Sequence, residues 1–199
     1  MKKLAIISVI VLSALSIVSC GNNTQKRIVS KTPIKAEVLG LTLCNTSSEE
    51  AIENALTKAT EKVFYTQSEK TGNATTVRAF PLPAMVSQIN YGAMSWHYVD
   101  VILNKDKKIT EIRIVASFEN IDRAKEQYDT ACLVLSQKYG KGNVNDEYQT
   151  SFWTDDTNSV GVNYVKSSAL DGSDRCFCTM YYVNRELANE AEKESTPDV

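Results

Sequence analysis

Histidine is almost absent from this 199-residue chain, which contains only His97. A Ser-His-acid or Cys-His hydrolase needs that residue as its base, because other side chains require large pKa shifts to titrate near neutrality. The nucleophile motif G-x-S-x-G is also missing. We therefore expect His97 to be a strand histidine on a half-exposed sheet face and the protein not to be an enzyme. A hydrolase that uses His97 is the least favoured hypothesis.

Other motifs of site chemistry are missing as well. The chain has no glycine-rich phosphate loop, no C-x-x-C pair and no EF-hand spacing, which argues against nucleotide binding, thiol redox catalysis and an EF-hand calcium site. Cys176 and Cys178 are closer together than the usual spacing of a structural zinc site. We expect neither a metal nor a cofactor.

A long apolar run occurs only at the start of the sequence, where Lys2 and Lys3 precede a mostly apolar stretch over 4–18. A charged start, a short apolar middle and a small-residue end are typical of a secretory signal peptide, which we assign to 1–19. The run ends in Ile17-Val18-Ser19-Cys20, which resembles the lipobox of bacterial lipoproteins. The resemblance implies that Cys20 becomes the acylated N-terminus, carrying palmitate-like chains that hold the protein to a membrane.

The remaining chain is acidic once the signal is removed. Its net charge is (22 − 2) − 24 = −4 with histidine neutral, which argues against nucleic acid as a partner. Basic residues gather in the polar segment that follows Cys20, at Lys26, Arg27, Lys31 and Lys35. We interpret 20–36 as the lipidated cysteine and a flexible tether, whose cations either meet anionic headgroups or are simply solvated. Gly21 is not the aspartate that retains lipoproteins in the inner membrane of model enterobacteria, which favours the outer membrane, on its periplasmic or its surface face.

Four further cysteines, Cys44, Cys132, Cys176 and Cys178, form an even set in an exported chain, which suggests disulfides. Cys176 and Cys178 share a strand face and are poorly placed to bond each other, so each would pair with Cys44 or Cys132. Buried free thiols are the alternative.

Hydrophobic periodicity divides 37–185 into helices and strands. An extended entry over 37–44 leads to a capping-box spacing at Thr46 to Glu49 or Ser47 to Glu50, and then to an amphipathic helix whose apolar stripe reaches Val63. Strands over 95–103 and 109–118 form a hairpin, and Asn120 caps a second helix that ends at Gly140. Further strands are expected over 148–154, 160–166 and 175–183, and possible strand character over 75–80.

This order favours one α+β domain over 37–185, with a polar helix or tail over 186–199. We predict an antiparallel β-sheet of about five to six strands with two main helices packed on one face. The succession of entry strand, capped helix and strand pair occurs twice, which suggests a tandem helix-plus-meander repeat.

The stretch 39–52, LGLTLCNTSSEEAI, resembles the opening of small bacterial lipoproteins of the SmpA/OmlA type, which include an accessory subunit of the BAM complex, and of the related β-lactamase-inhibitor-like fold. This resemblance implies an antiparallel scaffold that is used for protein contacts in the cell envelope, without catalytic residues. Such openings often carry a glycine before the cap, where this chain has Cys44.

Aromatic residues on the expected strands provide the remaining functional candidates. Trp and Tyr dominate binding hot spots, so Trp96, Tyr98 and Trp153 are the residues expected to anchor a partner if they lie on an exposed sheet face. The leading hypothesis is a lipid-anchored, non-enzymatic envelope protein that binds another protein or assists its assembly. The alternative is a surface lipoprotein that binds a small ligand or glycan with the same aromatics and Asp155 and Asp156.

Overall fold

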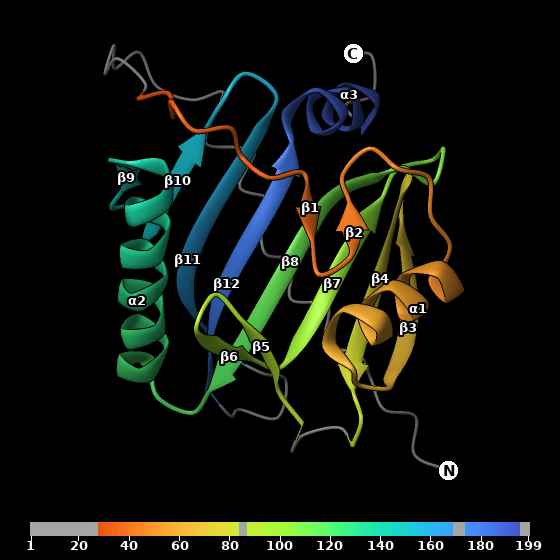
Figure 1. Cartoon of the computed structure of the whole chain (residues 1–199), viewed down its shortest axis with the longest axis horizontal. Helices are drawn as coiled ribbons and strands as arrows, with labels where there is room; N and C mark the ends of the chain where they lie inside the picture. The colour runs from red at the N-terminus through yellow and green to blue at the C-terminus, as the bar shows by residue number, and fades with distance from the viewer. Residues whose placement is uncertain (1–27, 84–86, 169–173, 196–199) are drawn as a thin grey trace.

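The computed structural model describes residues 28–83, 87–168 and 174–195, and Figure 1 shows their arrangement. The signal peptide, Cys20 and Gly21 lie outside these residues. The elements in chain order are β1 (Glu37–Val38), β2 (Leu41–Thr42), α1 (Glu49–Thr60), β3 (Phe64–Thr71), β4 (Ala74–Pro81), β5 (Ile89–Tyr91), β6 (Met94–Trp96), β7 (Tyr98–Leu103), β8 (Ile109–Phe118), α2 (Ile121–Tyr139), β9 (Asn143–Asn145), β10 (Thr150–Thr154), β11 (Asn158–Ser168), β12 (Asp174–Asn184) and α3 (Arg185–Ser195).

The fold is α+β and is built on one large antiparallel sheet. Eight strands are hydrogen-bonded in the order β3-β4-β7-β8-β12-β11-β10-β9. The expected number of strands was too small because β3 and β9 were not predicted, and β3 lies in a region rich in turn-forming residues where only 75–80, within β4, was given possible strand character. Thr71 pairs with Ala74 across a tight turn in which Gly72 adopts φ +57°, so the glycine makes a hairpin there instead of ending the regular structure.

The strand order divides the sheet into two similar halves. A helix followed by a four-stranded meander occurs first as α1 with β3, β4, β7 and β8, and again as α2 with β9 to β12. The last strands of the two meanders, β8 and β12, pair with each other at the centre of the sheet. Each half thus contains four strands, where the sequence pattern suggested a pair.

Both main helices begin at side-chain caps. Ser48 Oγ accepts a hydrogen bond from Ala51 N at 3.2 Å, and Asn120 Oδ1 accepts one from Asp122 N at 2.7 Å. The α2 cap is the predicted one, whereas α1 is capped by Ser48 instead of Thr46 or Ser47.

The core lies between the sheet and the layer formed by α1, α2 and the β1–β2 and β5–β6 hairpins (Figure 1). Ile52 and Leu56 of α1 and Leu135 of α2 are buried against alternate residues of the strands, such as Val101 and Ile114. These alternate positions all point to one face, as the period of two requires. Among the described helices and hairpins, α3 alone packs on the opposite face, where Ala188 meets Tyr181 and Val183. We call this second side of the sheet the open face.

Residues 28–36, which we call the strap, are held against the domain, contrary to the expectation of a flexible tether over 20–36. The strap crosses the ends of β10 to β12 before it enters β1 (Figure 1). Ser30 N donates to Thr154 O at 2.7 Å, Ile34 N donates to Asp155 Oδ2 at 2.6 Å, and the Ile34 side chain is buried. The apolar residue Ile34 was the signal in the sequence against a solvated tether, because an isoleucine in such a tether would have nothing to pack against.

Candidate binding surface

The open face carries side chains that the alternation of the strands directs away from the main helices. A row of paired residues crosses its centre, from Gln67 of β3 through Arg78, Asp100 and Arg113 to Tyr181 of β12. Charged side chains in the middle of a sheet are costly unless they are paired and hydrogen-bonded. The charged side chains of this face therefore need partners of opposite charge.

Two bidentate ion pairs neutralise the row. Arg78 Nε and Nη2 donate to the two carboxylate oxygens of Asp100 at 2.7 and 2.8 Å, and the Asp100 side chain is only 6% exposed. Arg113 pairs in the same way with Glu111 at 2.7 and 3.0 Å. Because bidentate pairs fix the orientation of both partners, this part of the face is rigid and carries no net charge.

The pairing also determines protonation. Burial alone lowers the pKa of Arg78, but the hydrogen bond and the charge of Asp100 outweigh this effect and raise it. The pKa of Arg113 is raised in the same way, with burial opposed by Glu111. Both guanidinium groups are therefore charged at every pH at which the protein is folded.

An aromatic cluster lies beside the Arg78–Asp100 pair. Tyr65 pairs directly with Phe80 across β3 and β4, and the rings of Phe80 and Tyr98 are 5.4 Å apart at an angle of 44°. The guanidinium carbon of Arg78 lies 4.8 Å from the centre of the Tyr98 ring, within the range of a cation–π contact. We define the aromatic surface as Tyr65, Arg78, Phe80 and Tyr98.

The outer part of the aromatic surface is accessible. The Tyr65 residue is 51% exposed, and its hydroxyl oxygen accepts a hydrogen bond from Gln67 Nε2 at 3.2 Å. Val63 and Leu82 are exposed and are joined by a backbone hydrogen bond at the same end of the β3–β4 hairpin. Burial and the neighbouring Asp100 raise the pKa of Tyr98, so its hydroxyl stays neutral and can donate to a partner. Exposed apolar side chains next to rigid aromatic and arginine groups are typical of protein contact sites.

Of the three aromatic anchors expected from the sequence, the structure brings only Tyr98 to this surface. Trp96 is 0% exposed and Trp153 is 2% exposed, and both belong to the core on the helix side. Their indole nitrogens donate to Tyr91 O and Gly140 O, at 3.0 and 2.8 Å. The condition under which these two tryptophans would anchor a partner, an exposed sheet face, is therefore not met.

Trp96 was misplaced because the strand expected over 95–103 is interrupted. Trp96 ends β6, which pairs with β5, and β7 begins only at Tyr98. The break at His97 changes the alternation, so Trp96 points to the core and Tyr98 to the open face. Tyr65, Arg78 and Phe80 were missed, although the alternation of Val77 and Ala79 with Arg78 and Phe80 was a signal for them.

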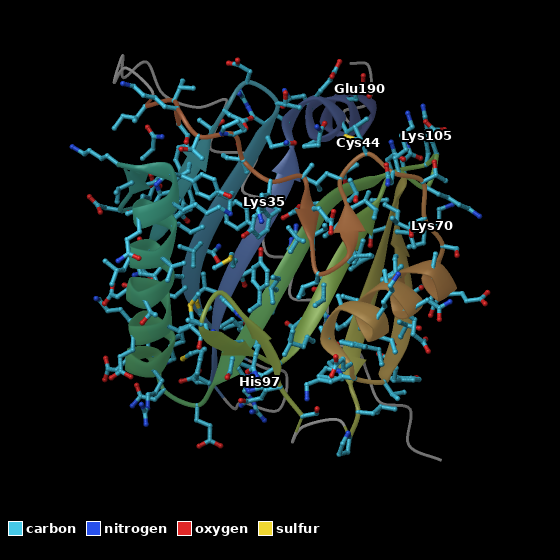
Figure 2. All side chains as sticks on the ribbon, viewed as in Figure 1. Lys35, Cys44, Lys70, His97, Lys105 and Glu190 are labelled. Atoms are coloured by element: carbon cyan, nitrogen blue, oxygen red, sulfur yellow. The ribbon has the colours of Figure 1, made fainter. Side chains whose placement is uncertain are left out.

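His97 occupies a structural position at the break between β6 and β7 (Figure 2). Its Nδ1 accepts a hydrogen bond from Ser117 N at 2.8 Å, and its ring meets Phe118 edge-on. Burial lowers the pKa of His97, which favours the neutral imidazole that this bond requires.

The four cysteines of the domain are free thiols in this structure, so the expected disulfides are not formed. Cys176 and Cys178 are buried in β12, and Cys132 is half-buried on α2. Cys44 is exposed and adopts φ +70°. Burial raises the pKa values of Cys44, Cys132 and Cys178, which keeps these thiols protonated and weakly reactive.

One of the two acidic residues proposed for a ligand, Asp155, has both carboxylate oxygens hydrogen-bonded within the domain. Asp155 Oδ1 accepts from Thr157 N and Asn158 N, while Oδ2 accepts from the strap at Ile34 N. Asp155 is therefore a structural residue. Within the described residues no group of three His, Cys, Asp or Glu side chains is arranged to hold a metal ion, and no helix there is long and apolar enough to cross a membrane.

Comparisons with models of protein families, with curated proteins and with solved structures find no match to this chain.

Proposed function

We propose that this protein is a lipid-anchored, non-enzymatic lipoprotein of the cell envelope that binds another envelope protein through the aromatic surface. The anchor is proposed at Cys20, because the sequence before it resembles a signal peptide that ends in a lipobox. The resemblance of 39–52 to SmpA/OmlA-type openings supports a role in protein contacts or assembly. We place the protein in the outer membrane on the basis of Gly21.

The observation that carries this proposal is the association of Tyr65, Phe80 and Tyr98 with Arg78 on a sheet face that α1 and α2 leave uncovered. Arg78 is already fixed by Asp100, so little side-chain freedom is lost when a partner binds, and such preorganisation favours affinity. The accessible Tyr65, Val63 and Leu82 indicate a partner that presents apolar side chains to this end of the domain.

Site-specific photo-crosslinking in intact cells tests this function. A photoreactive phenylalanine at position 65 is expected to give one dominant protein adduct, and the same probe at position 105, in the β7–β8 turn, is expected to give none. Arg78→Ala in the position-65 background should reduce that adduct about tenfold or more, as for the loss of an interface hot spot.

A matched control replaces an arginine away from the open face. Arg123 is an exposed residue of α2 that pairs with Glu126 at 3.1 Å, and Arg123→Ala should leave the adduct unchanged. Equal adducts from positions 65 and 105, or an adduct that is insensitive to Arg78→Ala, would contradict the proposed binding surface.

A further inference from the structure

The first residues of the strap are fixed at one edge of the sheet. Ile28 N donates to the Asn143 side-chain oxygen at 2.9 Å, and Asn143 Nδ2 donates back to Ile28 O at 2.8 Å. Asn143 begins β9, the edge strand opposite β3. The chain therefore enters the domain at the β9 edge.

The distance from this edge to Cys20 is short. The positions differ by 28 − 20 = 8 residues, and eight residues span at most about 29 Å even when fully extended. Whatever the conformation of that segment, a lipid on Cys20 would keep Asn143 within roughly this distance of the membrane surface. The β9 edge is thus the part of the domain that a membrane anchor restrains most closely.

Exposed apolar side chains gather at the same edge. We define the docking patch as Ile28, Val29, Val144 and Tyr148, which are all exposed, Val144 at 63%. The hydrogen bonds of Asn143 hold the Ile28 backbone at the start of β9, where Val144 is the next residue of the strand, and Tyr148 N donates to Asn145 Oδ1 in the turn after β9. Half of the eight large exposed apolar residues in the described part of the chain lie in this patch. Contiguous apolar patches on the surface of monomeric proteins usually mark a contact site.

The charges around the docking patch are mixed. Lys31 and Lys141 are exposed near it, and Asp146 and Glu147 are exposed in the turn that carries Tyr148. Attraction of the lysines to anionic headgroups is opposed by these two carboxylates. The docking patch would therefore bind a membrane mainly by inserting its aliphatic and tyrosine side chains at the bilayer interface. This mode of binding does not depend on anionic lipid.

We infer that the docking patch rests on the phospholipid surface and holds the domain with its β9 edge toward the membrane. This inference depends on the proposed lipid at Cys20, because the short reach to Ile28 is what brings the patch to the bilayer. Seven strand spacings of about 4.8 Å separate β9 from β3, so the sheet extends roughly 34 Å from the membrane-facing edge.

This orientation also determines where the aromatic surface lies relative to the membrane. Lys70 and Lys105 mark the side of the domain that lies opposite β9 (Figure 2), and Tyr65 is on the same edge strand as Lys70. With β9 at the lipid, the β3 edge points away from the membrane. The aromatic surface is then presented to a partner that lies beyond the headgroups.

Hydrogen–deuterium exchange on the lipidated protein in phosphatidylcholine vesicles tests this orientation, with the unacylated Cys20→Ser chain in solution as reference. Amides of 28–30 and 144–149 are expected to exchange about threefold or more slowly on vesicles, because lipid excludes water from them. Amides of 71–74 and 104–108, at the distant turns, should exchange equally in both samples.

Two double variants identify the side chains responsible. Val144→Ser with Tyr148→Ser should abolish the slower exchange of 144–149, while the lipidated chain stays on the vesicles. The matched control, Val63→Ser with Leu82→Ser, also removes two exposed apolar side chains and should preserve the slower exchange. Slowing that is confined to 28–30, or that survives the Val144 and Tyr148 changes, would overturn the docking patch.

The failure of this inference can be distinguished from that of the proposed function. The mass of the N-terminal peptide reports whether Cys20 carries lipid, and a chain without lipid overturns both the anchor and the orientation. A lipidated chain that gives the position-65 adduct in cells but no slower exchange at 144–149 overturns the orientation alone.

Discussion

The ring of Tyr181 lies directly against Gly161, its cross-strand partner on the open face. A Cβ atom built on Gly161 would overlap Tyr181 Cζ and Oη. Tyr181 is buried and packs against Ala188 of α3, so the ring has little room to move away. The glycine is required here for space, because the tyrosine covers the position that a side chain would take.

We expect Gly161→Ala to lower the free energy of unfolding by about 2 kcal/mol, the usual cost of overpacking a well-filled site. Urea denaturation followed by circular dichroism measures this change. In a Tyr181→Leu background, where the ring is gone, the same substitution should cost much less. Equal costs in the two backgrounds would show that the Tyr181 ring is not the obstacle.

The Arg78–Asp100 pair is expected to contribute to stability, unlike the exposed ion pairs of the same protein. Asp100→Asn leaves a guanidinium over the sheet without its counter-charge, which should lower the free energy of unfolding by about 3 kcal/mol. Asp129→Asn breaks the Lys125–Asp129 pair on α2, which has the same 2.7 Å separation but about half-exposed side chains, and should leave the free energy of unfolding nearly unchanged. Chemical denaturation of both variants provides the comparison, and similar losses would contradict the role given to burial.

The outcome at Asp100 also bears on binding. Asp100→Asn keeps Arg78 but releases its fixed orientation. If the variant stays folded, the position-65 adduct should become weaker. This separates the positioning of the guanidinium from its presence.

Cys44 occupies a backbone conformation that favours glycine. It adopts φ +70° two residues after the end of β2, where Cys44 N donates to Ile109 O at 2.8 Å. Cys44→Gly relieves a backbone strain of about 1 kcal/mol. Glycine also makes the unfolded chain more flexible, which costs about half of that gain. The variant should therefore be as stable as the native chain or slightly more stable. Cys44→Val places a β-branched residue in the same conformation and should cost about 1 kcal/mol or more.

Thermal unfolding of the two Cys44 variants provides the test, with Ser47→Gly as a control for the general effect of a glycine near the α1 cap. A Cys44→Gly protein that is clearly less stable than the native one would show that the thiol makes a contact that outweighs the strain.

The sequence was sufficient to predict the ends of an element where one local physical signal dominated. The α2 stripe ends at Gly140, and the β7–β8 hairpin turns where Asn104 Oδ1 accepts from Asp106 N and Lys108 N, a local pattern that the residue types predict. It was insufficient where residues far apart in the chain determine the structure. No local pattern shows that His97 interrupts a strand, and that interruption sends Trp96 to the core.

The same limit explains the strap and the aromatic surface. The residues over 28–36 mix polar and apolar types without a regular period, and the strap is held by Asp155, more than 100 positions away in the chain. The aromatic surface requires the register of β3, β4 and β7, which sets Tyr65 beside Phe80 and Phe80 near Tyr98. Pairing between strands that are separated by the β5–β6 hairpin is a property of the folded sheet and cannot be read from periodicity within one segment.

His97 gives the protein a pH dependence of stability with a defined sign. Burial lowers its pKa in the folded state, whereas the unfolded chain titrates near about 6.5. Between these two values the unfolded state binds more protons, so the free energy of unfolding falls as the pH is lowered through this window and is fully recovered above it. His97→Asn retains an acceptor for Ser117 N but does not titrate, and because this is the only histidine, the variant should lose this component. Urea titrations at pH 7.5 and 5.5 should therefore show a larger loss of stability for the native protein than for His97→Asn, and equal losses would mean that the ring is protonated as readily in the folded as in the unfolded chain.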